Sequence, residues 1–439
     1  MENNVKIIKR KKGNVLLFKN HQYYKHTVYK NESSLWNCSL KRKNQCKGSV
    51  TINKELIVIK SISHTCPDII SNELTESLDN LKSEVQTSDR PITQLYEEAK
   101  ESWLDKGNNI LTPFPEFNSV KHRLYTARNE YAGVTKMNFK KFHEVQVPLQ
   151  HRNLVLAEYY NEDTTILVFC MEEDRAKIEQ TKEIFGDATF NCSPPPFLQL
   201  FTIHAELGST ASTTNTKPLL YALLSDKKTE TYTALFNILK SQFPNWEPIK
   251  YHCDFELGAI NSIYKVFPNI EIKGCYYHWQ QAMWRMGKKI FGIKKSKPQA
   301  RVVALCSVLP LLPSERLLEG WEYIKSRCNT ENIKIQKFLN YLQRFWLKND
   351  IVKTLSVFGE RHRTNNVSES WHSKLTLKKK FTNIMRLLNA LIKLAKNKKN
   401  SPIRTRTKIA IENDEFITET LMELISGEIS VGYALEMLR

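Results

Sequence analysis

Residues 184–190 read IFGDATF and place one acid, Asp187, among residues that are otherwise apolar or small. This pattern is typical of a buried strand that carries a carboxylate. A buried carboxylate is costly unless it is paired with a cation or holds a metal ion. We therefore expect a functional site to be built around Asp187.

The segments after this stretch alternate between strand and helix patterns. Residues 197–207 and 218–225 are apolar runs of strand length, bounded by Pro, Gly and polar residues. Residues 229–243 change to a helical period, and residues 249–256 form a further strand with Asp254 near its end. Three strands, a helix and a strand ending in Asp form the opening order of a ribonuclease-H-like α/β fold. The two acids would then lie side by side on neighbouring strands.

Beyond the second acid the pattern predicts a helix, a fifth strand at residues 270–277 and a further helix at 278–291. Residues 297–360 keep helical periodicity interrupted by prolines, which predicts an all-helical insertion. Residues 361–375 then begin another helix, and this one carries Glu369.

The overall composition favours a globular protein with a polyanionic partner. The chain has 439 residues, 41% of them hydrophobic, and a formal net charge of +19. No apolar run is long enough for a membrane span, and the first residues lack the apolar segment of a secretory signal. Nucleic acid is favoured over a membrane surface as the partner. For the nine cysteines, metal ligation or burial is a better interpretation than a disulfide framework.

The charge is distributed unevenly along the chain. Residues 1–66 hold 14 Lys and Arg against 3 acids, whereas residues 68–89 hold six acids and one Lys and have the composition of a linker. Residues 91–131 have helical spacing with a basic face that is either a DNA contact or a solvated surface. Residues 374–408 contain 12 basic residues and no acid, which predicts a long cationic stripe.

Four residues of the first module have the spacing of a zinc site. Cys38 and Cys46 lie eight residues apart, and His64 and Cys66 follow 18 to 20 residues later. Two thiolates beside a strand pair and a His-x-Cys pair at a strand end could hold a tetrahedral zinc ion. A module this small needs such a clip, because metal binding supplies folding energy. The alternative is four unrelated buried or surface residues.

Three acids have the spacing of a catalytic metal site. Asp187, Asp254 and Glu369 are separated by 67 and 115 residues, and together they could hold two Mg²⁺ ions for phosphodiester chemistry. Each also has a structural alternative. Asp187 could be a hydrogen-bonded core acid, Asp254 a cap of the next helix, and Glu369 one half of a capping box with Asn366.

The first module resembles a FLYWCH-type zinc finger. The resemblance covers about residues 4–67 and rests on Phe18, Tyr23-Tyr24, Trp36-Asn37-Cys38, Cys46-Lys47-Gly48 and His64-Thr65-Cys66. That family usually ends in His-x-His, so Cys66 is a departure. Thiolate is an equally good ligand for zinc, and the resemblance implies one structural zinc ion.

The rest of the chain resembles the Mutator-like (MULE) transposase domain. Over about residues 152–400 the successive blocks are FGDATFNCSPPPFLQLFTIH, YHCDFELGAINSIY, CYYHWQQAMWRM and RTNNVSESWHSKL. The resemblance implies the catalytic acids Asp187, Asp254 and Glu369 with Mg²⁺ or Mn²⁺, and places the family's Cys-x-x-His pair on Cys275 and His278. The family usually has Asp-Gly-Thr-Phe in the first block, where this chain has Ala188.

These resemblances imply a DDE-type transposase that binds the terminal inverted repeats of a DNA element in the nucleus, and they leave a homo-oligomer open. The alternative is a domesticated, catalytically silent zinc-finger DNA-binding regulator. Accessory or DNA-contacting roles are one interpretation of Cys275, His278, Arg361, Arg363 and Asn365. The alternatives are a core thiol with a surface histidine for the first two and a solvated helix lead-in for the other three. Residues 9–12 (KRKK) are consistent with nuclear import.

The expected order of domains follows from these patterns. A β-rich zinc finger at 1–67 is followed by an acidic linker at 68–90 and by a helical region at 91–149 that is a candidate for DNA contact. The transposase domain of ribonuclease-H-like type covers 150–400 and includes the helical insertion at about 297–360. A C-terminal helical tail covers 401–439.

Overall fold

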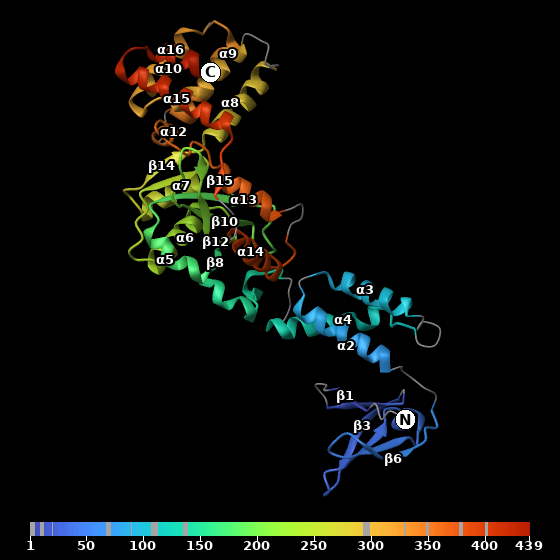
Figure 1. Cartoon of the computed structure of the whole chain (residues 1–439). Coiled ribbons are helices and arrows are strands. Elements are labelled where there is room, and N and C mark those ends of the chain that lie inside the picture. Colours follow the sequence, from blue (N-terminus) through green and yellow to red (C-terminus); the bar gives the residue numbers. More distant parts are fainter. Residues whose placement is uncertain are drawn as a thin grey trace. The chain divides into compact units, whose positions relative to one another are not determined.

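The protein is described from a computed structural model. The structure describes residues 5–8, 13–19, 21–66, 72–88, 90–106, 113–134, 139–292, 299–328, 331–347, 351–376, 381–399 and 403–439. The basic residues 9–12 and parts of the predicted cationic stripe (377–380 and 400–402) lie outside the described residues. The chain divides into two compact units, Met1–Lys136 and Met137–Arg439, which are treated separately (Figure 1).

The first unit begins with an antiparallel sheet whose described strands follow one another in chain order. They are β1 (Lys6–Ile8), β2 (Val15–Phe18), β3 (His21–Val28), β4 (Ser34–Cys38), β5 (Ser49–Ile52) and β6 (Val58–Ile62). A small core that includes Trp36 and Val50 packs on this sheet. In the register, Asn37 faces Ser49 and Ser49 faces Ile62. The end of β4, the start of β5 and the end of β6 therefore meet at one edge of the module.

The described part of this unit also contains a short helix, α1 (Lys41–Asn44), between β4 and β5, and three longer helices, α2 (Asn72–Thr87), α3 (Ile92–Asp105) and α4 (Phe117–Ala132). Helix α2 occupies the acidic stretch, so this stretch is not the irregular linker that its composition predicts. Its apolar residues Leu74, Leu78, Leu81 and Val85 recur every three to four positions and pack with α3 and α4. A buried apolar face therefore outweighs the polar composition of the segment.

The second unit contains a mixed sheet with strand order β14-β13-β9-β10-β12-β8-β7. The strands are β7 (Val155–Tyr160), β8 (Thr165–Cys170), β9 (Glu183–Thr189), β10 (Gln199–Glu206), β12 (Thr216–Leu224), β13 (Lys250–Cys253) and β14 (Glu271–Gly274). Strands β13 and β14 run parallel to β9, and the other neighbours are antiparallel. Cys253 pairs with Gly186, so the next residues, Asp254 and Asp187, are adjacent.

Helices cover both faces of this sheet. One face carries α5 (Arg175–Gln180), α6 (Thr229–Gln242) and α7 (Leu257–Val266), whose apolar residues form a common core with the strands. Ala188 packs against this core. The other face carries α13 (Asn366–Thr376) and α14 (Ile384–Lys399), which share a second core with β8, β10 and β12.

The predicted helical insertion is present and has a core of its own. It contains α9 (Gln299–Val308), α10 (Leu317–Ser326), α11 (Ile333–Leu342) and α12 (Val352–Leu355), and the preceding helix α8 (Tyr276–Phe291) packs in the same core. The C-terminal helices α15 (Lys408–Ser426) and α16 (Val431–Leu438) join the same core instead of forming a separate tail (Figure 1). Two short strands, β11 (Thr213–Thr214) and β15 (Arg404–Thr405), pair beside α13. Within the described residues, none of the helices has the length and apolarity that a membrane span requires.

Candidate functional site

Four metal-ligating side chains meet at the shared edge of β4, β5 and β6. Cys38 Sγ lies 3.7 Å from Cys66 Sγ. His64 Nδ1 lies 3.4 Å from Cys46 Sγ and 3.5 Å from Cys66 Sγ. With bonds of about 2.3 Å to sulfur and about 2.0 Å to nitrogen, a tetrahedral zinc site has edges of about 3.8 Å and 3.5 Å. The residues present therefore fit one zinc ion.

Neighbouring groups fix the histidine and favour a bound cation. The Tyr23 hydroxyl lies 2.7 Å from His64 Nε2, which leaves Nδ1 for a metal. Burial alone would raise the pKa of the Cys46 thiol, but backbone N–H groups, first that of Gly48, lower it to about 5. Burial and then the neighbouring thiols raise the pKa of Cys66 to about 12. A bound zinc ion would neutralise the negative charge of the thiolates, which otherwise repel one another in this cluster.

The three predicted acids come from three different elements of the second unit. Asp187 lies in β9, Asp254 follows β13, and Glu369 lies in the first turn of α13. Their side chains are partly exposed, with 11% of Asp187, 34% of Asp254 and 37% of Glu369 accessible. The structure thus brings them to the same end of the parallel strands, where solvent can reach them.

His278 lies between two of these acids. Its Nδ1 is 2.8 Å from Asp254 Oδ1, and its Nε2 is 3.6 Å from Glu369 Oε1. The Asp254 carboxylate, and then Cys275, raise the pKa of His278 to about 11. The imidazolium therefore neutralises part of the negative charge at the site. Asp254, Cys275 and His278 also have ligand atoms within 4.8 Å of one another.

The acids also influence one another electrostatically. Burial raises the pKa of the Glu369 carboxyl, the charge of His278 lowers it, and the charges of Asp254 and Asp187 raise it further. Carboxylates that repel one another in this way are suited to a divalent cation, and hard oxygen ligands suit Mg²⁺. The three acids therefore offer oxygen ligands of the kind that a divalent cation prefers, but they are not one of the described groups whose ligand atoms all lie within 4.8 Å of one another.

The structure bears differently on the structural alternatives for the three acids, which were a helix cap for Asp254, a capping box for Glu369 and a hydrogen-bonded core acid for Asp187. Helix α7 is capped at Glu256 without a side-chain bond from Asp254, so Asp254 is not its cap. Among the described contacts, Glu369 faces His278 and not the backbone of Asn366. Asp187 does behave as a hydrogen-bonded acid, because its Oδ1 accepts from the Ala188 amide at 2.8 Å.

Sequence reasoning missed two residues at this site. His372 Nδ1 lies 3.1 Å from Asp187 Oδ2, and its Nε2 lies 3.0 Å from the Thr202 hydroxyl. Its position three residues after Glu369 puts both on one side of α13, which was the available signal. Glu256 is a fourth nearby carboxylate. Burial raises its pKa, as do the charges of Asp254 and Asp187.

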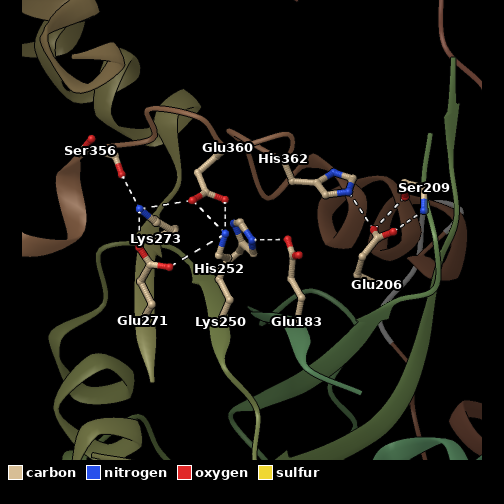
Figure 2. Close-up of polar contacts among 10 residues, drawn as sticks. All are labelled: Glu183, Glu206, Ser209, Lys250, His252, Glu271, Lys273, Ser356, Glu360 and His362. Atoms are coloured by element: carbon tan, nitrogen blue, oxygen red, sulfur yellow. Dashed lines mark hydrogen bonds and ion pairs between the residues drawn. The ribbon is translucent and has the colours of Figure 1, made fainter. Parts of the chain in front are cut away.

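Residues 356–365 connect the helical insertion to α13 and are held against the sheet by buried polar contacts (Figure 2). Glu360 accepts from Lys250 Nζ at 2.8 and 2.9 Å and pairs with Lys273 at 3.3 Å. His362 Nε2 lies 2.8 Å from Glu206. At the end of the segment, Asn365 Nδ2 donates to Gly186 O at 3.0 Å. This connecting segment therefore fixes where α13, and with it Glu369, meets β9.

Glu183, His252 and Glu360 also have ligand atoms within 4.8 Å of one another. Two ammonium groups already neutralise Glu360, and His252 Nε2 lies 2.7 Å from Glu183 Oε1. The group is thus satisfied without a metal, and its contacts position the connecting segment.

The other predicted accessory residues have partners inside the unit. Arg361 Nη2 donates to Thr213 O at 2.9 Å, Arg363 pairs with Asp414, and Asn365 is buried. Cys275 is also buried, and its Sγ accepts from the Asn365 amide at 3.2 Å. In the first unit, Arg128 is buried, and its Nε donates to Val85 O at 2.8 Å.

Comparison with known families accords with this arrangement. Residues 7–65 match the FLYWCH zinc finger domain, and residues 183–282 match the MULE transposase domain. The chain thus contains a match to each of these two domains, in this order. The second match includes Asp187, Asp254, Cys275 and His278, whereas Glu369 lies beyond it. No curated protein matches the chain.

The two matches support a transposase-like, DNA-binding protein. The FLYWCH match and the Cys/His cluster also indicate zinc. The suspected architecture of a FLYWCH finger followed by a MULE domain is confirmed.

Proposed function

We propose that this chain is a DDE-type transposase of the Mutator-like kind, which binds the ends of a DNA element and cleaves and joins its strands. The observation that carries this proposal is that Asp187, Asp254 and Glu369 lie toward one end of the parallel strands, close enough for the charges of Asp254 and Asp187 to raise the pKa of Glu369. They come from separate elements, and two of them lie within the region that matches the MULE domain. The strand order supports a ribonuclease-H-like domain.

Asp187, Asp254 and Glu369 would hold two Mg²⁺ or Mn²⁺ ions through their carboxylate oxygens. The chemistry supplied by such a pair, when bound, would be activation of a water or a 3′-hydroxyl and stabilisation of the leaving oxygen of a phosphodiester. The chain's own residues orient these ligands. His372 holds one oxygen of Asp187, and the connecting segment fixes the position of α13. His278 balances charge between Asp254 and Glu369.

The finger would supply recognition of terminal inverted repeats, with Cys38, Cys46, His64 and Cys66 holding one structural zinc ion. Its basic composition favours contacts with DNA phosphates. Nuclear import through residues 9–12 and assembly into a homo-oligomer belong to the same proposal. A reporter fusion that lacks residues 9–12 tests the import signal.

The test of function is cleavage of a plasmid that carries the genomic sequences flanking this coding region. Cleavage is expected with Mg²⁺ or Mn²⁺ and not with Ca²⁺, whose larger and looser oxygen shell misplaces the nucleophile. Asp254→Ala should abolish cleavage and leave DNA binding nearly intact. If the wild-type chain binds this DNA without cleaving it in Mg²⁺ or Mn²⁺, the chain is instead a catalytically silent DNA-binding regulator.

A further inference from the structure

A cavity of about 300 Å³ beside the start of α13 is lined by four arginines. Arg361 and Arg363 come from the connecting segment, and Arg404 and Arg406 come from β15 and the turn before α15. Four threonines add hydroxyl groups, and no acid is among the described residues of its wall. We call this cavity the arginine pocket.

The positive charge of the arginine pocket is only partly neutralised. In the described part of the chain, the ion pairs of the four arginines involve one carboxylate, that of Asp414, which both Arg363 and Arg406 contact. Four guanidinium groups against this carboxylate leave a net charge of +3. Burial, and then the neighbouring charge of Arg361, lower the pKa of Arg406. The arginines are thus close enough to repel one another, and an anion would stabilise the pocket.

One donor of the pocket's arginines lacks an acceptor. Arg361 Nη2 bonds Thr213 O, whereas Arg361 Nε is buried without a hydrogen-bond partner among the described residues. A buried donor left unpaired costs about 1 to 3 kcal/mol. The histidine of the wall, His362, is already held by Glu206 (Figure 2). The unmatched hydrogen-bonding capacity therefore lies with the arginines, whose planar fork suits phosphate.

The arginine pocket continues into a second cavity along α13. This cavity, of about 770 Å³, shares Thr214, Val367, Arg404 and Thr405 with the first. Its described wall also contains Lys374, Lys177 and Lys217 and no acid. The two lysines Lys177 and Lys217 share the single carboxylate of Asp174. A cationic surface thus extends beyond the size of one small anion.

The chemistry of the arginine pocket selects a phosphodiester over a free nucleotide. Its described wall holds no Phe, Tyr or Trp ring on which a base could stack, its one histidine is held by Glu206, and its apolar side chains are limited to Val367 and Ala410. Val367 and Glu369 lie two residues apart on α13, so their side chains point to opposite sides of the helix. A phosphate in the pocket would therefore lie across α13 from the Glu369 carboxylate.

We propose that the arginine pocket binds a backbone phosphate of DNA, and that the adjoining cavity along α13 carries the next part of the same strand. This inference rests on the proposed function, because it takes the DNA substrate as the ligand. It assigns Arg361, Arg363, Arg404 and Arg406 to a phosphate subsite that is separate from the zinc finger and from the three acids.

Chemical modification of arginines in the full-length protein tests this assignment. Arg404 is exposed, so an arginine-specific dicarbonyl reagent should modify it readily, and mass spectrometry reports the extent at each residue. The probes are duplex DNA, single-stranded DNA and inorganic phosphate, each with binding measured in the same sample. DNA should protect Arg404 severalfold, whereas Arg316 on the helical insertion is the matched exposed control and should stay reactive.

Equal reactivity of Arg404 with and without saturating DNA would overturn the inference. Protection of Arg404 by inorganic phosphate but not by either DNA probe would also overturn the inference and would identify a free-anion site. As a second measurement, Arg404→Gln should lower the slope of log K against log salt by about 0.9, and Arg316→Gln should leave it unchanged. Protection of Arg404 together with absent cleavage would count against the proposed catalysis and not against the phosphate subsite.

Discussion

The buried carboxylate of Glu360 offers a quantitative test of how the connecting segment positions α13. Its side chain is 7% exposed and contacts Lys250 and Lys273, which are 25% and 9% exposed. Burial alone would lower the pKa of Lys250, but the Glu360 carboxylate reverses this effect and raises it. The substitution Glu360→Gln keeps the shape of the side chain and removes the charge that both ammonium groups need.

The expected cost follows from the contacts that remain. Breaking a buried ion pair typically costs about 3 to 5 kcal/mol. Lys273 would keep Glu271 at 2.8 Å and the Ser356 carbonyl at 3.3 Å, and Lys250 would keep Glu271 only at 4.0 Å. One ammonium group is therefore left poorly paired. We expect Glu360→Gln to lower the free energy of unfolding by about 2 to 3 kcal/mol, slightly below that range.

Urea unfolding of the full chain, followed by tryptophan fluorescence, measures this free energy. The matched control is Glu271→Gln, because Glu271 contacts the same lysines but is 53% exposed. Its loss should cost less than about 1 kcal/mol. Replacing both partners in Glu360→Gln/Lys250→Met should recover much of the loss, since no charge is then stranded. If Glu360→Gln costs no more than Glu271→Gln, the connecting segment is not held in this way.

Two further predictions concern the zinc cluster and the response to acid. A Cβ on Gly48 would lie 2.4 Å from His64 Nδ1, so Gly48→Ala should displace this ligand and reduce the zinc content of the full chain from one ion toward none. Elemental analysis measures the zinc content, and an unchanged content would contradict the proposed geometry. The hydrogen bond with His252 holds the pKa of Glu183 below its usual value of 4.5. The stabilisation that this bond gives to the folded state is therefore complete above about pH 4.5, and it is lost as the pH falls through the lower pKa of Glu183 in the folded state. Glu183→Gln should therefore flatten the acid side of the stability curve in urea unfolding, and identical slopes for the variant and the wild type would refute this.

The strands of the second unit were predictable because their signal is local. Residues 197–207 and 218–225 are apolar runs of strand length, and β10 and β12 lie within or overlap them. The acidic segment at 72–87 was mispredicted because polar residues outnumber the four apolar ones that form its buried face. Helices α15 and α16 pack into the core of the helical insertion. This packing could not be predicted, because the periodicity of a helix shows that it has an apolar face but not which other helices that face contacts.

In the candidate site, too, some residues could be predicted from the sequence and others could not. Asp187 and Asp254 were predictable because each stands in or directly after an apolar strand, and parallel pairing then makes them neighbours. The position of His278 between Asp254 and Glu369 could not be predicted. It depends on where β14 ends and α8 begins, and on how the connecting segment places α13. The predicted strand at 270–277 extends past the observed start of α8 at Tyr276.

The central claim is that Glu369 completes a metal-binding site with Asp187 and Asp254. The most direct test compares Glu369→Gln with Glu319→Gln, because both acids lie in the first turn of a helix and lose the same charge there. Cleavage of the flanking-sequence plasmid in Mg²⁺ is measured for both variants at equal DNA occupancy. The account predicts that Glu369→Gln abolishes cleavage while Glu319→Gln retains it. Near-normal cleavage by Glu369→Gln would contradict the three-acid site.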